Sequence, residues 1–401
     1  MSETLSDFRE RAREWLRANA EPRMTAERRW GVGSDSVAVF HDLDATAERA
    51  LIQELCDWQQ RKFDAGFVEL APEYEEIFAE EEAGFVTPPR HELVSVTLHL
   101  IAPTIRLLGT TYLQDLAVAP LRRGEQTACQ LFSEPSAGSD LASLGTRAVL
   151  DGSTWIVNGQ KVWSSGAQFA DWGELIARTD PDVPKHQGMT AFLLPMNTPG
   201  VTVRPLRQMS GGSSFCEVFF DDVRIPDSLR IGDVGAGWQV ALTTLGFERS
   251  HSSSNDSVGG SFADLVALMK HLDRLGDPIT RQRLAEVYTH ERLAAVAATR
   301  DRETLRDGLP PGPVGSLRKL QWVNKMMLIS DVVTSELGPR LAADTGEWGT
   351  FAWTEHVLGA PGYRIAGGSD EIQRTIIAER LLGLPAEPRA DRGVAWRDIP
   401  K

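Results

Sequence analysis

The chain has 401 residues and a net charge of −14, from 42 Lys and Arg against 56 Asp and Glu. A general nucleic-acid or anionic-membrane binder needs a basic surface, so this charge argues against both functions. The 42% hydrophobic and 24% charged residues are typical of a globular protein. At about 150 residues per domain, the length predicts two or three domains.

The three cysteines, Cys56, Cys129 and Cys216, lie far apart and show no metal-ligand spacing. They suggest neither a disulfide framework nor a zinc site, so we expect no metal and a reducing, cytoplasmic location. Residues 1–23 are charged and amphipathic rather than like a signal peptide. No stretch approaches the roughly 20 apolar residues of a membrane span.

Helical periodicity occupies both ends of the chain. Before about residue 124, apolar residues recur three and four positions apart, as at Leu51 and Leu55. The acidic run at 75–82 is expected to be a solvated helix face. The helical period returns after Gly237, and the polar tract at 252–255 predicts an interruption or the end of the first helix there.

Between these ends the apolar period changes to two, which predicts strands. Asp151-Gly152 predicts a hairpin turn and Asn158-Gly159 a second turn, with further strands at 190–194, 201–203 and 217–220. The expected fold class is α+β. Its predicted domains are an N-terminal helical domain (residues 1–126), a middle antiparallel β domain (127–233) and a C-terminal helical domain (234–401).

The sequence contains no signature of a Rossmann dinucleotide site, a P-loop, a zinc protease or a serine hydrolase. Three segments carry small or helix-capping residues that would let a ligand approach the backbone: 132–140, 162–166 and 367–374. Each also has a purely structural interpretation. These are a β-turn in the first segment, a core position for Trp163 in the second and an N-cap at Ser369 or Asp370 in the third.

Taken together and in order, these segments resemble the motifs of the acyl-CoA dehydrogenase family. The matching runs are Ser-Glu-Pro-Ser-Ala-Gly-Ser-Asp at 133–140, Asn-Gly-Gln-Lys-Val-Trp at 158–163, Phe-Phe-Asp-Asp-Val-Arg-Ile-Pro at 219–226 and Gly-Gly-Ser-Asp-Glu-Ile-Gln-Arg at 367–374. The resemblance covers most of the chain. It implies a C-terminal four-helix bundle, FAD as cofactor and α,β-dehydrogenation of an acyl-CoA thioester to a 2-enoyl-CoA, as in lipid β-oxidation.

The resemblance also implies particular site residues. Trp163 would lie over one face of the flavin ring, Ser165 would bond near flavin N5, and the terminal run would meet the FAD diphosphate and adenosine. The implied FAD-binding residues are Gln130, Phe132, Ser133, Gly138, Ser139, Trp163, Ser165, Ser369 and Glu371. The implied substrate-binding residues are Ser139, near the pantetheine arm, with Arg249, Gly367 and Gly368.

The catalytic base departs from the commoner family pattern. Many members carry their Glu in a terminal Glu-Gly-Thr motif, where this chain has Gly367. Members resembling the isovaleryl and long-chain enzymes carry it on an earlier helix in a Glu-Arg pair, which matches Glu248-Arg249. The resemblance therefore implies Glu248 as the base, with the Gly367 N–H as a donor to the thioester carbonyl. The alternative for Glu248 is an ordinary ion-paired helix residue, and Arg249 either positions the terminal segment or forms a salt bridge.

Partners follow from the same resemblance: an acyl-CoA substrate, an electron-transfer flavoprotein as acceptor and a homo-oligomer, dimer or tetramer. No clear match exists for the family's Arg-containing segment that meets adenosine across a dimer, expected around 270–282. A partner-dependent subunit beside a paralogous chain, and an acyl-CoA oxidase, are therefore alternatives.

The acyl group would enter between 94–105 and 240–248. The polar run at 251–257 would line its pocket or form a solvated face.

Overall fold

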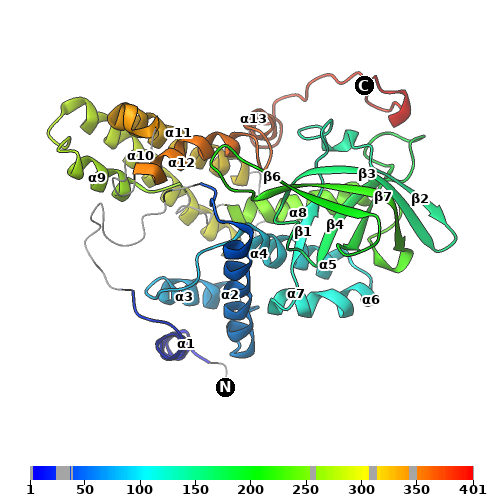
Figure 1. The fold of residues 1–401 in the computed structure, drawn as a ribbon, viewed down its shortest axis with the longest axis horizontal. Coiled ribbons are helices and arrows are strands. Elements are labelled where there is room, and N and C mark those ends of the chain that lie inside the picture. The colour runs from blue at the N-terminus through cyan, green and yellow to red at the C-terminus, as the bar shows by residue number, and fades with distance from the viewer. Residues whose placement is uncertain are drawn as a thin grey trace.

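A computed structural model describes residues 3–23, 37, 39–252, 259–306, 314–342 and 350–400, with only the backbone at 249–252, 301–306 and 350–352. In Figure 1 the C-terminal helices lie to the left, the sheet to the right and most N-terminal helices below. The predicted order of helices, strands and helices is therefore confirmed. The polar run at 251–257 lies outside the residues whose side chains are described.

The N-terminal part is helical. Its elements are α1 Leu5–Asn19, α2 Ala45–Asp64, α3 Pro72–Glu82, α4 Glu92–Val96, α5 Ala102–Leu108, α6 Thr111–Leu113 and α7 Ala119–Arg123, with π-helical turns at Thr97–Ile101 and Gln114–Val118. Thr4 caps α1 by accepting a hydrogen bond from the Asp7 amide at 3.2 Å. The helical spacing of Phe8, Ala12 and Leu16 puts all three on the buried face of α1.

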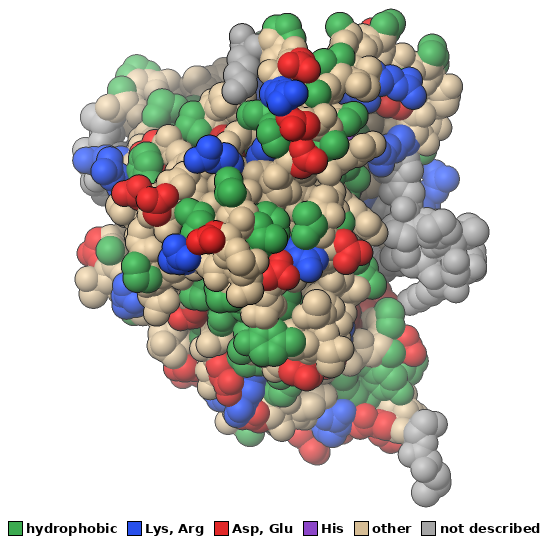
Figure 2. Space-filling view, turned by 90° about the vertical axis from the view of Figure 1, so that its right-hand side faces the viewer, with side chains coloured by type: hydrophobic (Ala, Val, Ile, Leu, Met, Phe, Trp, Pro, Cys, Tyr) green, Lys and Arg blue, Asp and Glu red, His purple; other side chains and the backbone are tan. Residues whose placement is uncertain are grey.

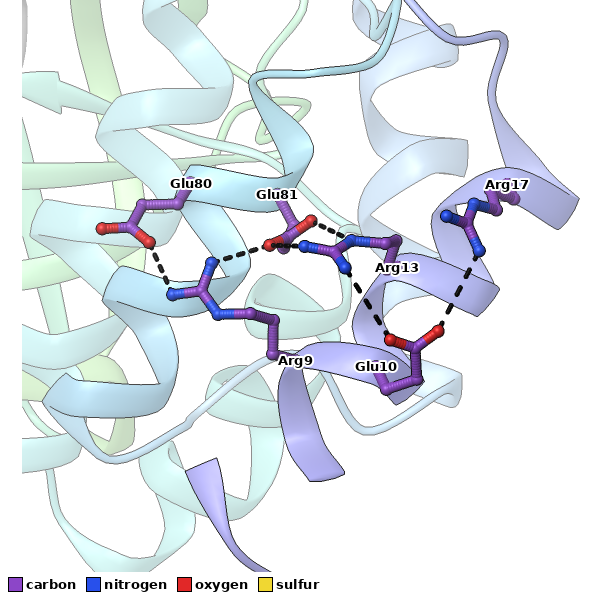
Figure 3. A network of polar contacts seen from close by, with 6 residues as sticks. All are labelled: Arg9, Glu10, Arg13, Arg17, Glu80 and Glu81. Carbon is purple, nitrogen blue, oxygen red and sulfur yellow. Dashed lines mark hydrogen bonds and ion pairs between the residues drawn. The ribbon is translucent and has the colours of Figure 1, made fainter. Parts of the chain in front are cut away.

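The acidic run of α3 faces α1 in part (Figure 3). The Glu81 carboxylate accepts from Arg13 at 2.8 Å and from Arg9 at 2.7 Å, while Glu80 pairs with Arg9 at 2.7 Å. The hydrogen bond from Arg13, together with that from Arg9, holds the pKa of Glu81 below its ordinary value, although burial acts to raise it. The run thus forms a charged, partly solvated helix surface that also joins two helices.

The middle of the chain forms one eight-stranded sheet. Its strands are β1 Ala128–Leu131, β2 Arg147–Asp151, β3 Thr154–Ser165, β4 Trp172–Arg178, β5 Met189–Pro195, β6 Val201–Leu206, β7 Phe215–Pro226 and β8 Arg230–Ile231. Their spatial order is β6-β7-β3-β2-β4-β5-β8, with β1 against β4. The pairs β1·β4 and β2·β4 are parallel, so the mostly antiparallel sheet is mixed.

One of the two predicted turns is wrong. Gly152 sits in the hairpin between β2 and β3 as expected, with φ +64°. Asn158-Gly159 instead lies inside β3, at an irregularity in its pairing with β7. A Cβ on Gly159 would lie 2.7 Å from the Thr146 Cα, so glycine is needed here for the close approach of a neighbouring segment.

The C-terminal part is helical again, with α8 Gly237–Ser252, α9 Phe262–His271, α10 Pro278–Arg306, α11 Val314–Leu337, α12 Thr350–Gly359 and α13 Asp370–Ile376. Helix α8 is packed into the core of the sheet through Val240 and Ala241. Helices α9 to α12 share a separate core around the fully buried Trp353. The position of α8 between sheet and bundle brings its far end to the terminal glycine segment.

Among the described helices, none combines the length and apolar character required to cross a bilayer. Cys56, Cys129 and Cys216 are buried and free. Figure 2 shows the side of the molecule where the sheet lies, with acidic and basic side chains interspersed over its described surface.

Candidate active site

The carboxylate of Glu248, near the end of α8, lies beside the terminal glycine turn. Its Oε1 is 3.1 Å from the position that a Cβ on Gly367 would occupy. Glu248 itself is half-buried. The structure thus brings together the two residues on which the predicted chemistry depends, although one lies on α8 and the other in the turn before α13, far apart in the chain.

The glycine turn is held from two sides. Gly367 has φ +65° and Gly368 φ +84°, conformations that favour glycine. The Gln373 side chain donates to the Gly367 carbonyl at 2.7 Å, and Lys319 donates to the Gly368 carbonyl at 2.9 Å. Burial lowers the pKa of Lys319, and the nearby carboxylates, Asp370 first, oppose that effect. These contacts keep the turn in place beside Glu248.

The residues after the glycines begin α13. The Ser369 hydroxyl accepts from the Ile372 amide at 3.3 Å, so the N-cap interpretation is confirmed for Ser369. Asp370 is instead buried and pairs with Arg364 at 2.9 Å. The Glu371 side chain is exposed and lies 3.7 Å from Arg374. The side chain of Arg249 lies outside the described residues.

The loop after β1 is fixed to the sheet by a buried ion pair. Lys161 is 0% exposed and donates to the Glu134 carboxylate and to the Phe132 carbonyl, each at 2.8 Å. The same carboxylate accepts from the amides of Gly145 at 2.6 Å and Thr146 at 2.9 Å. Burial lowers the pKa of Lys161 to about 8, although Glu134 opposes that effect.

The predicted ligand-binding residues of this anchored loop differ in their exposure to solvent. Phe132 is buried and Ser133 is half-buried, whereas Gly138 and Ser139 are exposed. On β1, Gln130 is half-buried, and its buried Nε2 has no hydrogen-bond partner among the described residues. A buried amide without a partner is costly unless a ligand or water satisfies it.

Trp163 does not lie in the core. Its side chain is 62% exposed, whereas Trp155 on the same strand is 4% exposed. The pairing of β3 with β7 shifts between Lys161 and Ser164, and Trp163 there has φ +64°. A positive φ is uncommon for a bulky residue, so the irregularity holds the ring outward at a cost. The neighbouring Ser165 pairs with Phe215, and the Ser164 hydroxyl is buried without a partner in the described chain.

An open groove of about 450 Å³ runs beside the first half of α8. His186 and Gln187 of the β4–β5 loop form one wall, with Trp238 and Leu242 of α8 opposite; Gly235, Ala236, Gln239 and Thr243 complete the lining. The His186 and Trp238 rings meet edge to face, with centroids 4.9 Å apart. No sequence pattern points to His186, because its position in the groove depends on the β4–β5 loop folding back on α8.

A second missed cluster joins three segments near the site. His91 Nε2 lies 3.0 Å and His41 Nε2 3.3 Å from the same oxygen of the buried Glu48. Burial would raise the pKa of Glu48, but the two histidines lower it to about 2. His91 Nδ1 accepts from the Leu93 amide, so a neutral His91 carries its proton on Nε2 and donates it to Glu48. The arrangement therefore fits a hydrogen-bonded anchor, with no sequence signal beyond isolated histidines.

Comparison with known proteins identifies the family of the chain. Residues 129–223 match the family description "Acyl-CoA dehydrogenase, middle domain", and residues 235–382 match "Acyl-CoA dehydrogenase, C-terminal domain". Acyl-CoA dehydrogenase IpdE1 of Mycobacterium tuberculosis is 33% identical over 392 residues, which are 96% of this chain and 99% of IpdE1. The chain belongs to the acyl-CoA dehydrogenase family and is thus an oxidoreductase of acyl-CoA substrates.

Acyl-CoA dehydrogenase FadE34 of the same organism is 40% identical over 71% of this chain, a match that spans only 39% of FadE34. Among solved structures, "Tcur3481-Tcur3483 steroid ACAD" aligns over 96% of this chain and 100% of that chain, with a TM-score of 0.75 and 23% identity. A glutaryl-CoA dehydrogenase from Mycobacterium smegmatis in complex with FADH2 aligns over 97% of both chains, with a TM-score of 0.66 and 21% identity. These structural likenesses confirm the fold.

Proposed function

We propose that the chain is an FAD-dependent acyl-CoA dehydrogenase in which Glu248 removes the α-proton of an acyl-CoA thioester. The carboxylate of Glu248 beside Gly367 carries the proposal. In many relatives the base stands at the position of Gly367, and here a carboxylate from α8 reaches the same space. A glycine there leaves that space free for it.

The α-proton of a thioester is a weak acid, so its removal needs a polarised carbonyl and a base within hydrogen-bond reach. The Gly367 N–H is a main-chain donor, so it acts without a side chain at that position. Lys319 and Gln373 fix the turn that carries this N–H. Bound FAD would supply the acceptor for the β-hydrogen, which leaves as hydride.

The residues around Trp163 fit a planar, polar flavin ring. The exposed ring of Trp163 offers an aromatic face, and Gln130 Nε2 and Ser164 Oγ are buried polar atoms without partners in the described chain. Nothing lies within 4 Å of a Cβ position on Gly138, so the loop leaves room for a ligand. Phe132, Ser133, Ser139 and Ser165 would complete the flavin site, with Ser369 and Glu371 toward the diphosphate.

The groove along α8 fits the CoA arm. At about 1.5 Å per helical residue, Leu242 lies about 9 Å and Trp238 about 15 Å along the axis from Glu248. The groove therefore leads away from the reacting carbon toward the sheet, with an apolar floor for pantetheine. Ser139, Gly367 and Gly368 would contact the substrate, and Arg249 would position the terminal segment.

Aromatic side chains near Glu248 favour a bulky lipid or steroid acyl group. The Tyr363 ring stacks on Phe40 at 5.2 Å and meets Trp322 at 4.6 Å. Burial raises the pKa of Tyr363, and the charges of Glu92 and Glu248 add to that effect. Flat rings offer a broad apolar wall to a rigid alicyclic group. The similarity in fold to "Tcur3481-Tcur3483 steroid ACAD" is compatible with such an acyl group.

A panel of straight-chain, branched and steroid-side-chain CoA thioesters with a dye acceptor tests this function. The purified protein should contain FAD and turn over steroid-side-chain thioesters fastest. Electrons should pass to an electron-transfer flavoprotein more readily than to oxygen. Absence of both flavin and turnover with every thioester, alone and with a partner chain, would refute the proposal.

One observation favours a partner-dependent version of the same activity. In the segment expected to meet adenosine across a dimer, Arg274 pairs with Glu336 at 2.8 Å and with Asp277 at 3.2 Å. Its guanidinium is thus engaged within its own subunit. The description "Tcur3481-Tcur3483 steroid ACAD" names two proteins. FAD content and molar mass of the chain purified alone decide this: one FAD per protomer in a homo-oligomer would argue against a required paralogous partner.

A further inference from the structure

The segment after α13 returns to the sheet (Figure 1). Residues 389–397, the C-terminal strap, lie along the β4–β5 loop. Ala395 forms a β-bridge with Pro184, and the Trp396 amide donates to the Val183 carbonyl at 2.9 Å. The strap thus touches the loop that carries the wall of the groove.

Trp396 anchors the strap. Its indole N–H donates to the Ser143 carbonyl at 3.2 Å, and the Arg178 guanidinium lies 4.9 Å from its ring centroid. Arg178 is buried and donates to the carbonyls of Lys185 and Ala142, each at 2.6 Å. One buried cation therefore joins the strap, the β4–β5 loop and the segment after Asp140.

Lys185 is a second cation, after Arg178, that joins the strap to neighbouring segments. Its Nζ lies 2.6 Å from the Asp391 carboxylate of the strap and 2.7 Å from that of Asp140, and its side chain is 8% exposed. Asp140 directly follows Gly138 and Ser139. These two residues belong to the loop that is proposed above to contact the flavin and the pantetheine arm. Hydrogen bonds between charged groups in a partly buried site are strong and directional. Asp391 therefore couples the strap to both the loop and the β4–β5 wall.

His186 and Gln187, which follow Lys185 in the chain, line the groove, and the His186 ring packs against Trp238 of α8. None of the residues that line this groove belongs to the strap. The strap therefore contacts the β4–β5 loop outside the groove, and Asp391 is connected to the lining residues through Lys185.

We propose that the C-terminal strap is a positioning element for the CoA arm, in which Asp391 acts through Lys185 to hold His186 and Gln187 at the groove and Ser139 at its loop. This inference rests on the proposed function, because it takes the groove to be the CoA site. The inference assigns a role in CoA affinity to residues that follow α13. Asp391 is a positioning residue, since it does not line the groove.

The test compares Asp391→Ala with wild-type holoenzyme. Losing a hydrogen bond between charged groups should raise the KM for the best thioester of the panel, and the Kd for free coenzyme A by calorimetry, about tenfold. The kcat of the FAD-loaded protein at saturation should stay within twofold, since Glu248 is untouched. Asp391→Glu should restore most of the affinity. Arg397→Ala is the matched control, because Arg397 pairs with the exposed Asp182 at 2.7 Å on the solvent side.

An unchanged KM and Kd in Asp391→Ala would overturn the proposal, as would an equal loss in Arg397→Ala. If Asp391→Ala loses FAD or folds poorly, Asp391→Asn removes the charge and keeps the shape. Native-like FAD content and wild-type coenzyme A affinity in that variant would equally overturn it. Failure of the proposed function shows separately, as wild-type protein that neither binds coenzyme A nor oxidises any thioester.

Discussion

The Glu248 carboxylate lies 3.1 Å from the place of a Cβ on Gly367, so an acidic side chain of α8 occupies the space beside a glycine turn. A larger residue at 367 would compete with that carboxylate for the space. In the proposed mechanism, catalysis depends on two positions that must stay complementary in size: one supplies the carboxylate and the other supplies room and a main-chain N–H.

Replacing Glu248 with Gln should remove the base and preserve the shape. We expect kcat to fall by about 10²–10⁴, the usual contribution of a general base. FAD content and the melting temperature should be unchanged. Steady-state kinetics with a dye acceptor measure this, with Glu54→Gln on the exposed face of α2 as the control. Turnover near the wild-type rate would exclude Glu248 as the base.

Gly367→Ala should affect activity more than stability. Both Gly367 (φ +65°) and Gly383 (φ +66°) would be strained as alanine, by about 1–2 kcal/mol. Only at Gly367 does the new Cβ meet Glu248, whereas nothing lies within 4 Å at Gly383. Displacing the base should lower kcat about tenfold or more in Gly367→Ala alone. Equal kinetics of the two variants would contradict the proposed crowding.

Trp163→Ala should weaken FAD binding without unfolding the sheet. The ring is 62% exposed, so its removal costs little packing within this chain. Aromatic stacking on a planar base contributes about 1–3 kcal/mol, so the Kd for FAD should rise about tenfold or more. Flavin fluorescence titration of the apoprotein measures this change. Val149→Ala on β2, 49% exposed, is the control and should bind FAD normally.

Glu134→Gln should destabilise the protein strongly. It leaves the fully buried Lys161 ammonium without its carboxylate, a loss that typically costs about 3–5 kcal/mol. Denaturant unfolding should show a lower midpoint. Asp151→Asn breaks the exposed pair with Arg224 and should cost less than about 1 kcal/mol. Comparable losses in the two variants would mean that burial of the Lys161 pair is unimportant.

Glu174 should make stability pH-dependent. It is 0% exposed, accepts from Thr244 at 2.7 Å, and burial raises its pKa to about 8. Between its unfolded pKa near 4.5 and about 8 the native state holds the extra proton, so stability must fall as pH rises through this window. At about 1.4 kcal/mol per pKa unit the loss reaches a few kcal/mol.

Glu174→Gln mimics the protonated acid and should remove that slope. Thermal unfolding from pH 5 to pH 9 should show the variant gaining stability relative to wild type as pH rises. Identical pH profiles of the two proteins would show that Glu174 is not protonated in the native state.

Much of the fold could be predicted from local patterns. The period-two segments became β5, β6 and β7, and the Asp151-Gly152 signal became a hairpin, because alternation and turn chemistry depend on neighbours in sequence. The same local signal failed at Asn158-Gly159, where the close approach of Thr146 requires glycine inside a strand. Local chemistry was ambiguous there, and a residue from another segment decided the conformation.

The candidate site likewise has some features that the sequence predicted and others that only the tertiary structure decided. The family, the motif segments and the candidacy of Glu248 followed from residue order, and acidic composition argued against nucleic acid without arguing against anionic cofactors. Whether the Glu248 carboxylate reached Gly367, whether Trp163 faced outward, and whether the C-terminal strap contacted the β4–β5 loop were decided by tertiary structure. Those relationships depend on packing between segments distant in the chain, which the periodicity and spacing of one sequence do not encode.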